Sequence, residues 1–171
     1  MTRRSLPMKS IHALFMALIM LVTAYRVQAQ TLEWGSEVFS DLVDSKEQAL
    51  DETFIFQLGA FEVGFVPDET NVSEWSTRWV AFSQAGYNQD LTYFTGTATM
   101  NDDGSSSYDP GSGIDFSGLE AYIWIRNGDI PVGGTEWLLV RKASWVFPIA
   151  TPGCCDNQEP LQWSISQLES G

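Results

Sequence analysis

The feature that most constrains the fold is a two-residue alternation of apolar and polar side chains. Over residues 119–126, aliphatic side chains occupy every second position, and Glu, Tyr, Trp and Arg stand between them. Such alternation is typical of strands that bury one face. Segments of similar character occur at 31–43 (divided at Gly35-Ser36), 53–61, 91–100, 136–147 and 161–168. The sequence therefore predicts a mainly β protein.

Turn signals separate these segments. An Asn-Asp-Asp-Gly run at 101–104 has the signature of a tight turn, and Pro or Gly clusters follow at 109–113, 127–129 and 132–134. Short strands divided in this way predict an antiparallel β-sandwich or jelly roll. Neither a linker nor a repeat divides residues 30–171, so we expect them to form a single domain.

One segment departs from the strand pattern. Its apolar residues recur at helical spacing: Val72, Trp75, Trp79 and Phe82. Asn71 as N-cap with Glu74 three residues later fits a capping box, and Gly86 is a typical C-terminal stop. The pattern predicts an amphipathic helix over 71–85 that packs on the sheet through its aromatic stripe.

The N-terminus has the layout of an export signal. Basic residues at 3, 4 and 9 precede an apolar run at 13–24, which is shorter than the roughly 20 residues needed to span a bilayer. Val27-Gln28-Ala29 is an acceptable cleavage site, so we expect a signal peptide at 1–29. The alternative is a retained amphipathic anchor. The signal predicts export to the bacterial envelope surface or beyond, without stable membrane insertion after cleavage.

Cleavage would change the charge balance. Four of the nine basic residues and the one histidine, His12, precede the cut, whereas all 22 acidic residues follow it. The remaining five basic residues leave a net charge of −17 on residues 30–171. This charge disfavours nucleic acid and anionic membranes as partners. The absence of histidine excludes Ser-His-Asp and Cys-His catalysis and His-ligated zinc, and two cysteines cannot form a Cys₄ zinc site.

The polar side of segment 119–126 supplies a candidate ligand-binding face. Its residues are Glu120, Tyr122, Trp124 and Arg126. An aromatic pair beside an acid and a base could stack a sugar ring and bond its hydroxyl groups. The alternative is that the helix or a second sheet covers Tyr122 and Trp124, which the usual burial of aromatic side chains favours. Trp137 and Trp145 allow the same two interpretations.

Four aspartates between residues 101 and 115 form a candidate metal site. They are Asp102, Asp103, Asp109 and Asp115. Clustered carboxylates suit Ca²⁺, although their spacing does not match an EF-hand loop. Solvated turn residues are the competing interpretation, since Asp is common in turns. No cofactor is required by any motif, and calcium is the one that the sequence suggests.

Cys154 and Cys155 are adjacent. Export would bring them into an oxidising compartment. A vicinal disulfide, an intermolecular bridge and free thiols all stay open, although a vicinal bond is strained and closes too short a loop for the usual entropic gain. No neighbouring base or cation activates the thiols, so a redox role is not favoured.

Four stretches carry a family resemblance. They are Trp-Gly-Ser-Glu-Val-Phe-Ser-Asp at 34–41, Phe-Gln-Leu-Gly-Ala-Phe-Glu-Val-Gly-Phe at 56–65, Ala-Tyr-Ile-Trp-Ile-Arg-Asn-Gly at 121–128 and Cys-Cys-Asp-Asn at 154–157. Over residues 31–168 the chain resembles uncharacterised exported β-rich bacterial proteins that often end in a PEP-CTERM sorting tail. The resemblance implies a cell-surface or matrix setting and assigns no catalytic residue. The tail is missing before Gly171, which leaves a truncated chain and a released protein as alternatives.

These observations favour binding or organisation of extracellular polysaccharide or matrix by a secreted acidic protein. A glycoside hydrolase needs two carboxylates about 5–9.5 Å apart, and no motif selects a pair among the 22 acids. An enzyme is therefore not favoured, although the question stays open. A self-associating structural surface protein, bridged through a cysteine, is the third hypothesis. The sequence predicts no particular oligomeric state.

Overall fold

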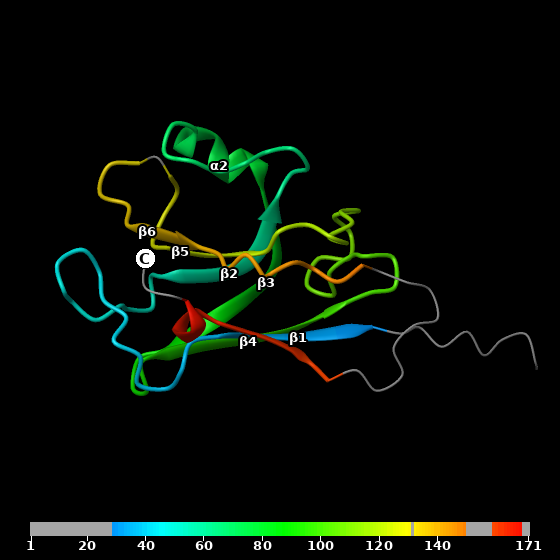
Figure 1. Ribbon diagram of the computed structural model, residues 1–171. Helices are drawn as coiled ribbons and strands as arrows, with labels where there is room; N and C mark the ends of the chain where they lie inside the picture. Colours follow the sequence, from blue (N-terminus) through cyan, green and yellow to red (C-terminus); the bar gives the residue numbers. More distant parts are fainter. Residues whose placement is uncertain (1–28, 131, 150–158, 169–171) are drawn as a thin grey trace, which may run out of the picture.

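The computed structural model describes residues 29–130, 132–149 and 159–168 (Figure 1). In chain order the elements are β1 (Gln30–Gly35), β2 (Ile55–Phe61), α2 (Val72–Arg78), β3 (Trp79–Asn88), β4 (Tyr93–Met100), β5 (Tyr122–Arg126), β6 (Trp137–Val140), β7 (Leu161–Ser164) and the 3₁₀ helix η1 (Ile165–Gln167). The prediction of a mainly β protein with one α-helix is confirmed for the described residues. Each segment that alternation marks as a strand contains one.

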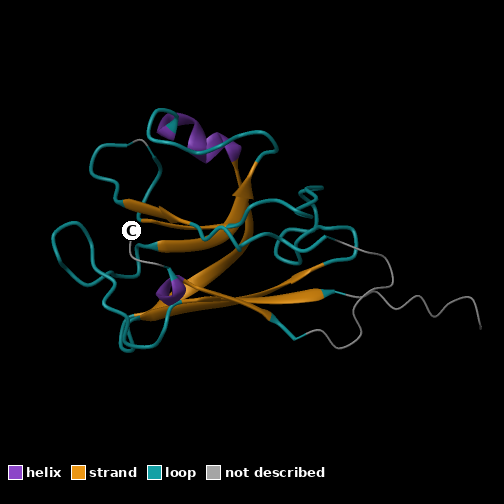
Figure 2. Cartoon of the chain, in the orientation of Figure 1, coloured by secondary structure: helices purple, strands orange, loops and turns teal. Residues whose placement is uncertain are grey.

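The seven strands form a single sheet in the order β6-β5-β2-β3-β4-β1-β7. The sheet curls strongly into a half-barrel (Figure 2). Its strand pairs are antiparallel except that β7 runs parallel to β1. The predicted all-antiparallel arrangement is therefore wrong for that pair, and one curled mixed sheet is not clearly a sandwich or a jelly roll.

The long strand β3 connects the two parts of the curled sheet. Its first seven residues run along β2, from Trp79 opposite Phe61 to Ala85 opposite Phe56. Its last residues pair with β4 instead, from Gly86 to Asn88. An irregularity in register falls between Leu58 and Gly59 of β2, opposite Ser83 and Ala81 of β3. Bulges of this kind bend a strand and increase its twist, which lets one sheet wrap around a core.

Side chains on the two faces of the sheet pack into two separate hydrophobic cores. Ile123 and Ile125 of β5 point into the main core inside the curl, together with Phe56 and Phe82. The other face of β5 contributes to a second core beneath α2, on the outer side of the sheet (Figure 1). The buried members of this second core are Phe61, Trp75, Tyr122, Trp124 and Ile130. Both faces of β5 are therefore covered.

The helix is shorter than the predicted 71–85. It ends at Arg78, because Trp79 adopts extended dihedral angles (φ −78°, ψ 135°) and begins β3. The aromatic stripe is consequently divided. Trp75 and Trp79 contribute to the second core, whereas Phe82 lies in the main core. The stripe is buried as predicted, but a helix and a strand share it.

The predicted helix ends also differ. Asn71 precedes the helix, but its side chain makes no capping hydrogen bond. Its Oδ1 instead accepts from Trp75 Nε1 at 2.7 Å and from the backbone N–H of Asp68 at 2.9 Å. The capping box with Glu74 is therefore wrong, because the Asn71 side chain is used by its neighbours. Gly86 lies within β3 and does not terminate the helix.

Two predictions fall outside the described residues. One is the signal peptide predicted at 1–29, of which residues 1–28 are not described, and the other is the pair Cys154 and Cys155. The first strand begins at Gln30, so cleavage after Ala29 would leave β1 whole. Within the described ranges, no helix is both long and apolar enough to cross a membrane.

Candidate functional site

The predicted aromatic binding face is part of the second core. Tyr122 and Trp124 are only 6% and 1% exposed. Trp124 lies edge-on to Trp75 of α2 and to Trp79, at ring-centroid distances of 6.4 and 5.3 Å. Tyr122 packs edge-on against Phe61 at 5.4 Å. The alternative of burial under the helix is confirmed, and it corrects the expectation of a sugar-stacking face on these two rings.

The acid of that face is bonded within the protein. Glu120 Oε2 accepts the Tyr122 hydroxyl at 2.9 Å and Arg141 Nη1 at 3.0 Å. Burial, together with this hydrogen bond to a carboxylate, raises the pKa of Tyr122 to about 12. Glu120 and Arg141 stay about half exposed, so their ion pair contributes little stability.

The base of that face is similarly engaged. The Arg126 guanidinium lies 4.9 Å from the centroid of the Trp124 ring and donates to the Gly128 carbonyl at 3.0 Å. It also approaches Asp129 Oδ1 at 3.4 Å. The four residues are thus neighbours, but their ring faces and most of their polar atoms are turned to protein groups.

The four aspartates of the predicted calcium loop are exposed turn residues. Asp103 accepts the backbone N–H of Ser105 at 2.9 Å, and Asp115 accepts that of Ser117 at 2.8 Å. Hydrogen bonds from the Ser105 hydroxyl and N–H lower the pKa of Asp103. Asp102 and Asp109 lie in the same loop. Among the described residues, no three His, Cys, Asp or Glu side chains gather closely enough to hold a metal ion. The calcium hypothesis gains no support and stays an untested prediction.

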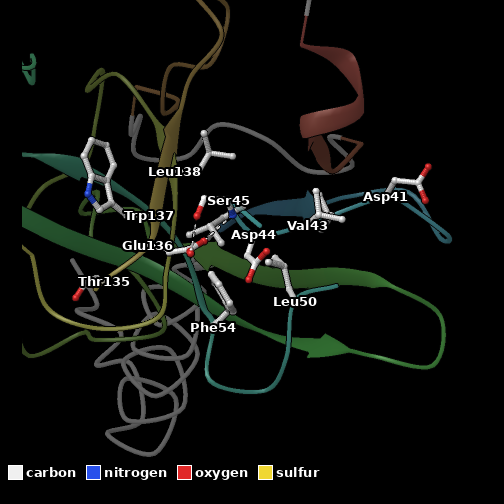
Figure 3. Close-up of a pocket in the computed structure, with 12 residues that line it drawn as sticks. Asp41, Val43, Asp44, Ser45, Leu50, Phe54, Thr135, Glu136, Trp137 and Leu138 are labelled. Carbon is white, nitrogen blue, oxygen red and sulfur yellow. Dashed lines mark hydrogen bonds between the residues drawn. The ribbon is translucent and has the colours of Figure 1, made fainter. Parts of the chain in front are cut away.

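A groove elsewhere in the molecule offers a different candidate site. It has a volume of about 630 Å³, within the range of small-molecule sites, and lies between segment 41–54 and strands β5 and β6 (Figure 3). Its apolar lining comes from Leu42, Val43, Leu50, Phe54, Ile125 and Leu138. Its polar lining comes from Asp41, Asp44, Ser45, Thr135 and Glu136. Trp137 is the remaining lining residue.

Local hydrogen bonds shape one wall of the groove. Asp44 Oδ1 accepts the backbone N–H groups of Lys46 and Gln48, both at 2.8 Å, which tightens the turn that follows it. An isolated antiparallel bridge joins Val43 to Ala49. Leu50 then returns the chain to the main core, where it is 7% exposed. The wall is therefore an ordered turn with one end anchored in the core.

The Glu136 carboxylate ties this wall to the start of β6. Its Oε2 accepts the Ser45 backbone N–H and its Oε1 accepts the Ser45 hydroxyl, each at 2.8 Å (Figure 3). The backbone N–H of Glu136 in turn donates to Asn127 Oδ1 at 2.8 Å. Glu136 therefore links segment 41–54 to the start of β6 and to Asn127.

Two β6 residues that border the groove stay open to solvent. Leu138 is 50% exposed and Trp137 is 41% exposed. Leu138 stands opposite Ile125 of β5, whereas the Trp137 ring points to the other side and packs edge-on against Trp75 at 4.9 Å. The groove thus combines apolar surface with carboxylate and hydroxyl groups. That combination suits a ligand carrying both C–H faces and hydroxyl groups.

No sequence pattern marks this groove. Ser45 and Glu136 are 91 residues apart, and neither belongs to a motif. Comparisons with models of protein families, with curated proteins and with solved structures found no match to this chain.

Proposed function

We propose that this protein is an exported, non-catalytic binding module that holds a neutral, hydroxyl-rich polymer, an extracellular polysaccharide, in the groove between segment 41–54 and β6. The observation that carries the proposal is the composition of the groove. Half-exposed Leu138 offers apolar surface next to the Glu136 carboxylate and the Ser45–Thr135 rim. Sugars present the matching combination of C–H faces and hydroxyl donors.

Charge supports the choice of a neutral ligand. Asp41, Asp44 and Glu136 all border the groove. Carboxylates accept hydrogen bonds from hydroxyl groups but repel phosphate, sulfate and uronate groups. The overall charge, −13 for the chain and −17 after the expected cleavage, acts in the same direction at longer range.

The test is binding of the purified protein to a panel of neutral and acidic polysaccharides, with Ca²⁺ and with chelator. We expect retention on a neutral class that is insensitive to the chelator. Leu138→Ser and Asp41→Asn should each weaken retention about tenfold. The first removes apolar surface from an open part of the groove, and the second removes a negative charge and one acceptor oxygen. Neither change touches the Ser45–Glu136 link.

Matched controls separate the groove from the rest of the surface. Val63→Ser and Glu69→Gln make the same kinds of change at exposed positions outside the groove lining, and both should bind like the wild type. Retention that survives both groove variants would contradict the proposed site. Failure to bind any neutral polysaccharide would contradict the proposed function, and release of sugar from the panel would indicate a glycoside hydrolase instead.

A further inference from the structure

Strand β6 ends the sheet on one side and leaves its outer edge unpaired. Within the described residues, β6 forms a ladder with β5 alone. An unpaired edge exposes a row of backbone N–H and C=O groups that can bond to another strand. Residues Trp137–Val140 include no proline and no charged side chain, the usual devices that protect an edge.

The side chains on this edge are apolar and accessible. Trp137 and Leu138 are exposed, and Leu139 and Val140 are only partly buried. Charged residues stand at the two ends of the strand: Glu136 precedes it, and Arg141 and Lys142 follow it. Lys142 makes no ion pair with any described residue.

We propose that β6 is a docking edge for a second copy of this chain, which joins two half-barrels into one continuous sheet. A twofold axis perpendicular to the sheet places the two β6 strands antiparallel. The same face of each sheet then lies on the same side of the joined sheet. Residues opposite one another must point to the same side, and side chains alternate along a strand. Their residue numbers therefore differ by an even number.

One register of the four-residue strand matches charge and shape. With Leu139 opposite itself, Leu138 stands opposite Val140 of the second copy. The residues at and just beyond the strand ends are then brought near one another, Glu136 near Lys142 and Trp137 near Arg141. The pairing therefore brings apolar side chains together, an acid next to a base, and an aromatic ring next to a guanidinium group. Because of the twofold symmetry, each of these three pairs occurs twice. Opposite charges at the two strand ends make this edge complementary to itself.

Leu138 and Glu136 lie on the same face of β6, so the pairing brings the grooves of both copies to one side of the joined sheet. A polymer could then follow both. This inference does not require the proposed function, because the edge pairing is measured without any polysaccharide.

The test is sedimentation equilibrium of the purified protein from low micromolar to millimolar concentration, with a reducing agent present. Reduction removes any contribution from a bridge through Cys154 or Cys155. A four-residue edge buries little area, so we expect a weak, concentration-dependent dimer. Leu138→Lys should raise its dissociation constant about tenfold or more, because a lysine on an edge opposes pairing.

Charge reversal tests the register. Lys142→Glu places two carboxylates opposite one another at each strand end and should raise the dissociation constant about tenfold at low salt. The difference from wild type should shrink at high salt, where screening removes the repulsion. Val63→Lys is the control, since it makes the same charge change as Leu138→Lys at an exposed site away from β6. It should not weaken the dimer.

A protein that stays monomeric throughout the concentration range would overturn the proposal. A dimer with the same dissociation constant in Leu138→Lys, Lys142→Glu and wild type would overturn it as well, because another surface would then form the contact. Circular dichroism confirms that each variant keeps its β structure. Polysaccharide binding by a strictly monomeric protein would leave the proposed function intact and refute the edge pairing alone.

Discussion

Replacing Trp124 with alanine distinguishes a core residue from a ligand-binding one. The side chain is 1% exposed and touches Trp75 of α2 and Trp79 of β3, so its removal leaves a cavity between the helix and the sheet. Truncating a buried Trp or Phe to Ala costs about 3–5 kcal/mol. The Trp124 Nε1 has no hydrogen-bond partner among the described residues, and an unpaired buried donor costs about 1–3 kcal/mol.

The alanine variant removes that unpaired donor together with the ring, so we expect the lower part of the range, about 3 kcal/mol. Trp137→Ala is the matched comparison, because Trp137 is 41% exposed and, among the described rings, contacts that of Trp75 alone. We expect it to cost about 1 kcal/mol.

Urea denaturation followed by far-UV circular dichroism measures both changes as shifts in midpoint at constant slope. Thermal unfolding should show a fall of about 10 °C for Trp124→Ala. Equal destabilisation by the two variants would refute the description of a second core beneath α2. A Trp124→Ala protein that is fully stable but loses polysaccharide binding would restore the sugar-stacking interpretation.

Two further predictions concern a turn and a tyrosine. Gly104 has φ +79°, and a Cβ there would lie 1.8 Å from Asp115 Oδ1, whereas Gly113 at φ +66° has nothing within 4 Å. Gly113→Ala should cost about 1 kcal/mol for the left-handed backbone alone, and Gly104→Ala should cost clearly more by urea denaturation; equal costs would contradict the close approach. Because the folded pKa of Tyr122 is raised from 10.0 to about 12, its contribution to stability is present below pH 10 and is lost as the pH rises towards 12. A tyrosine absorbance titration should contain a component near pH 12 that moves to lower pH in Glu120→Gln, and no movement would contradict the assigned hydrogen bond.

The strands were the most predictable part of the fold. Alternation depends on which face of a strand is buried, and that information is local. Segment 119–126 illustrates this, since its aliphatic positions Ile123 and Ile125 lie in the main core. The parallel pairing of β7 with β1 was not predictable, because no local pattern records which distant strand lies alongside.

The helix illustrates how a local pattern fails. The spacing of Trp75, Trp79 and Phe82 is compatible with one helical face, yet the first two and the third belong to different cores. From Trp79 onward the chain pairs with β2, and this sheet pairing overrides the helical periodicity. The bulky residues of 79–82 also suit a strand.

The candidate site was the least predictable part. The sequence-predicted binding face, with Tyr122 and Trp124, was recognisable from residue type. Only the packing of α2 on the sheet shows that these rings are buried. The groove depends on Ser45 meeting Glu136 across 91 residues. A hydroxyl residue in a turn and an acid before a strand are ordinary features, so neither marks a site until the fold brings them together.

We propose above that the groove between segment 41–54 and β6 binds a neutral polysaccharide. The most direct measurement is a two-dimensional ¹⁵N–¹H NMR titration of the protein with a soluble neutral oligosaccharide from the retained class. We expect saturable shifts confined to residues 41–54 and 135–138, with the buried Trp124 indole signal unchanged. Shifts centred on another surface, or no saturable shift with any neutral oligosaccharide, would contradict the account.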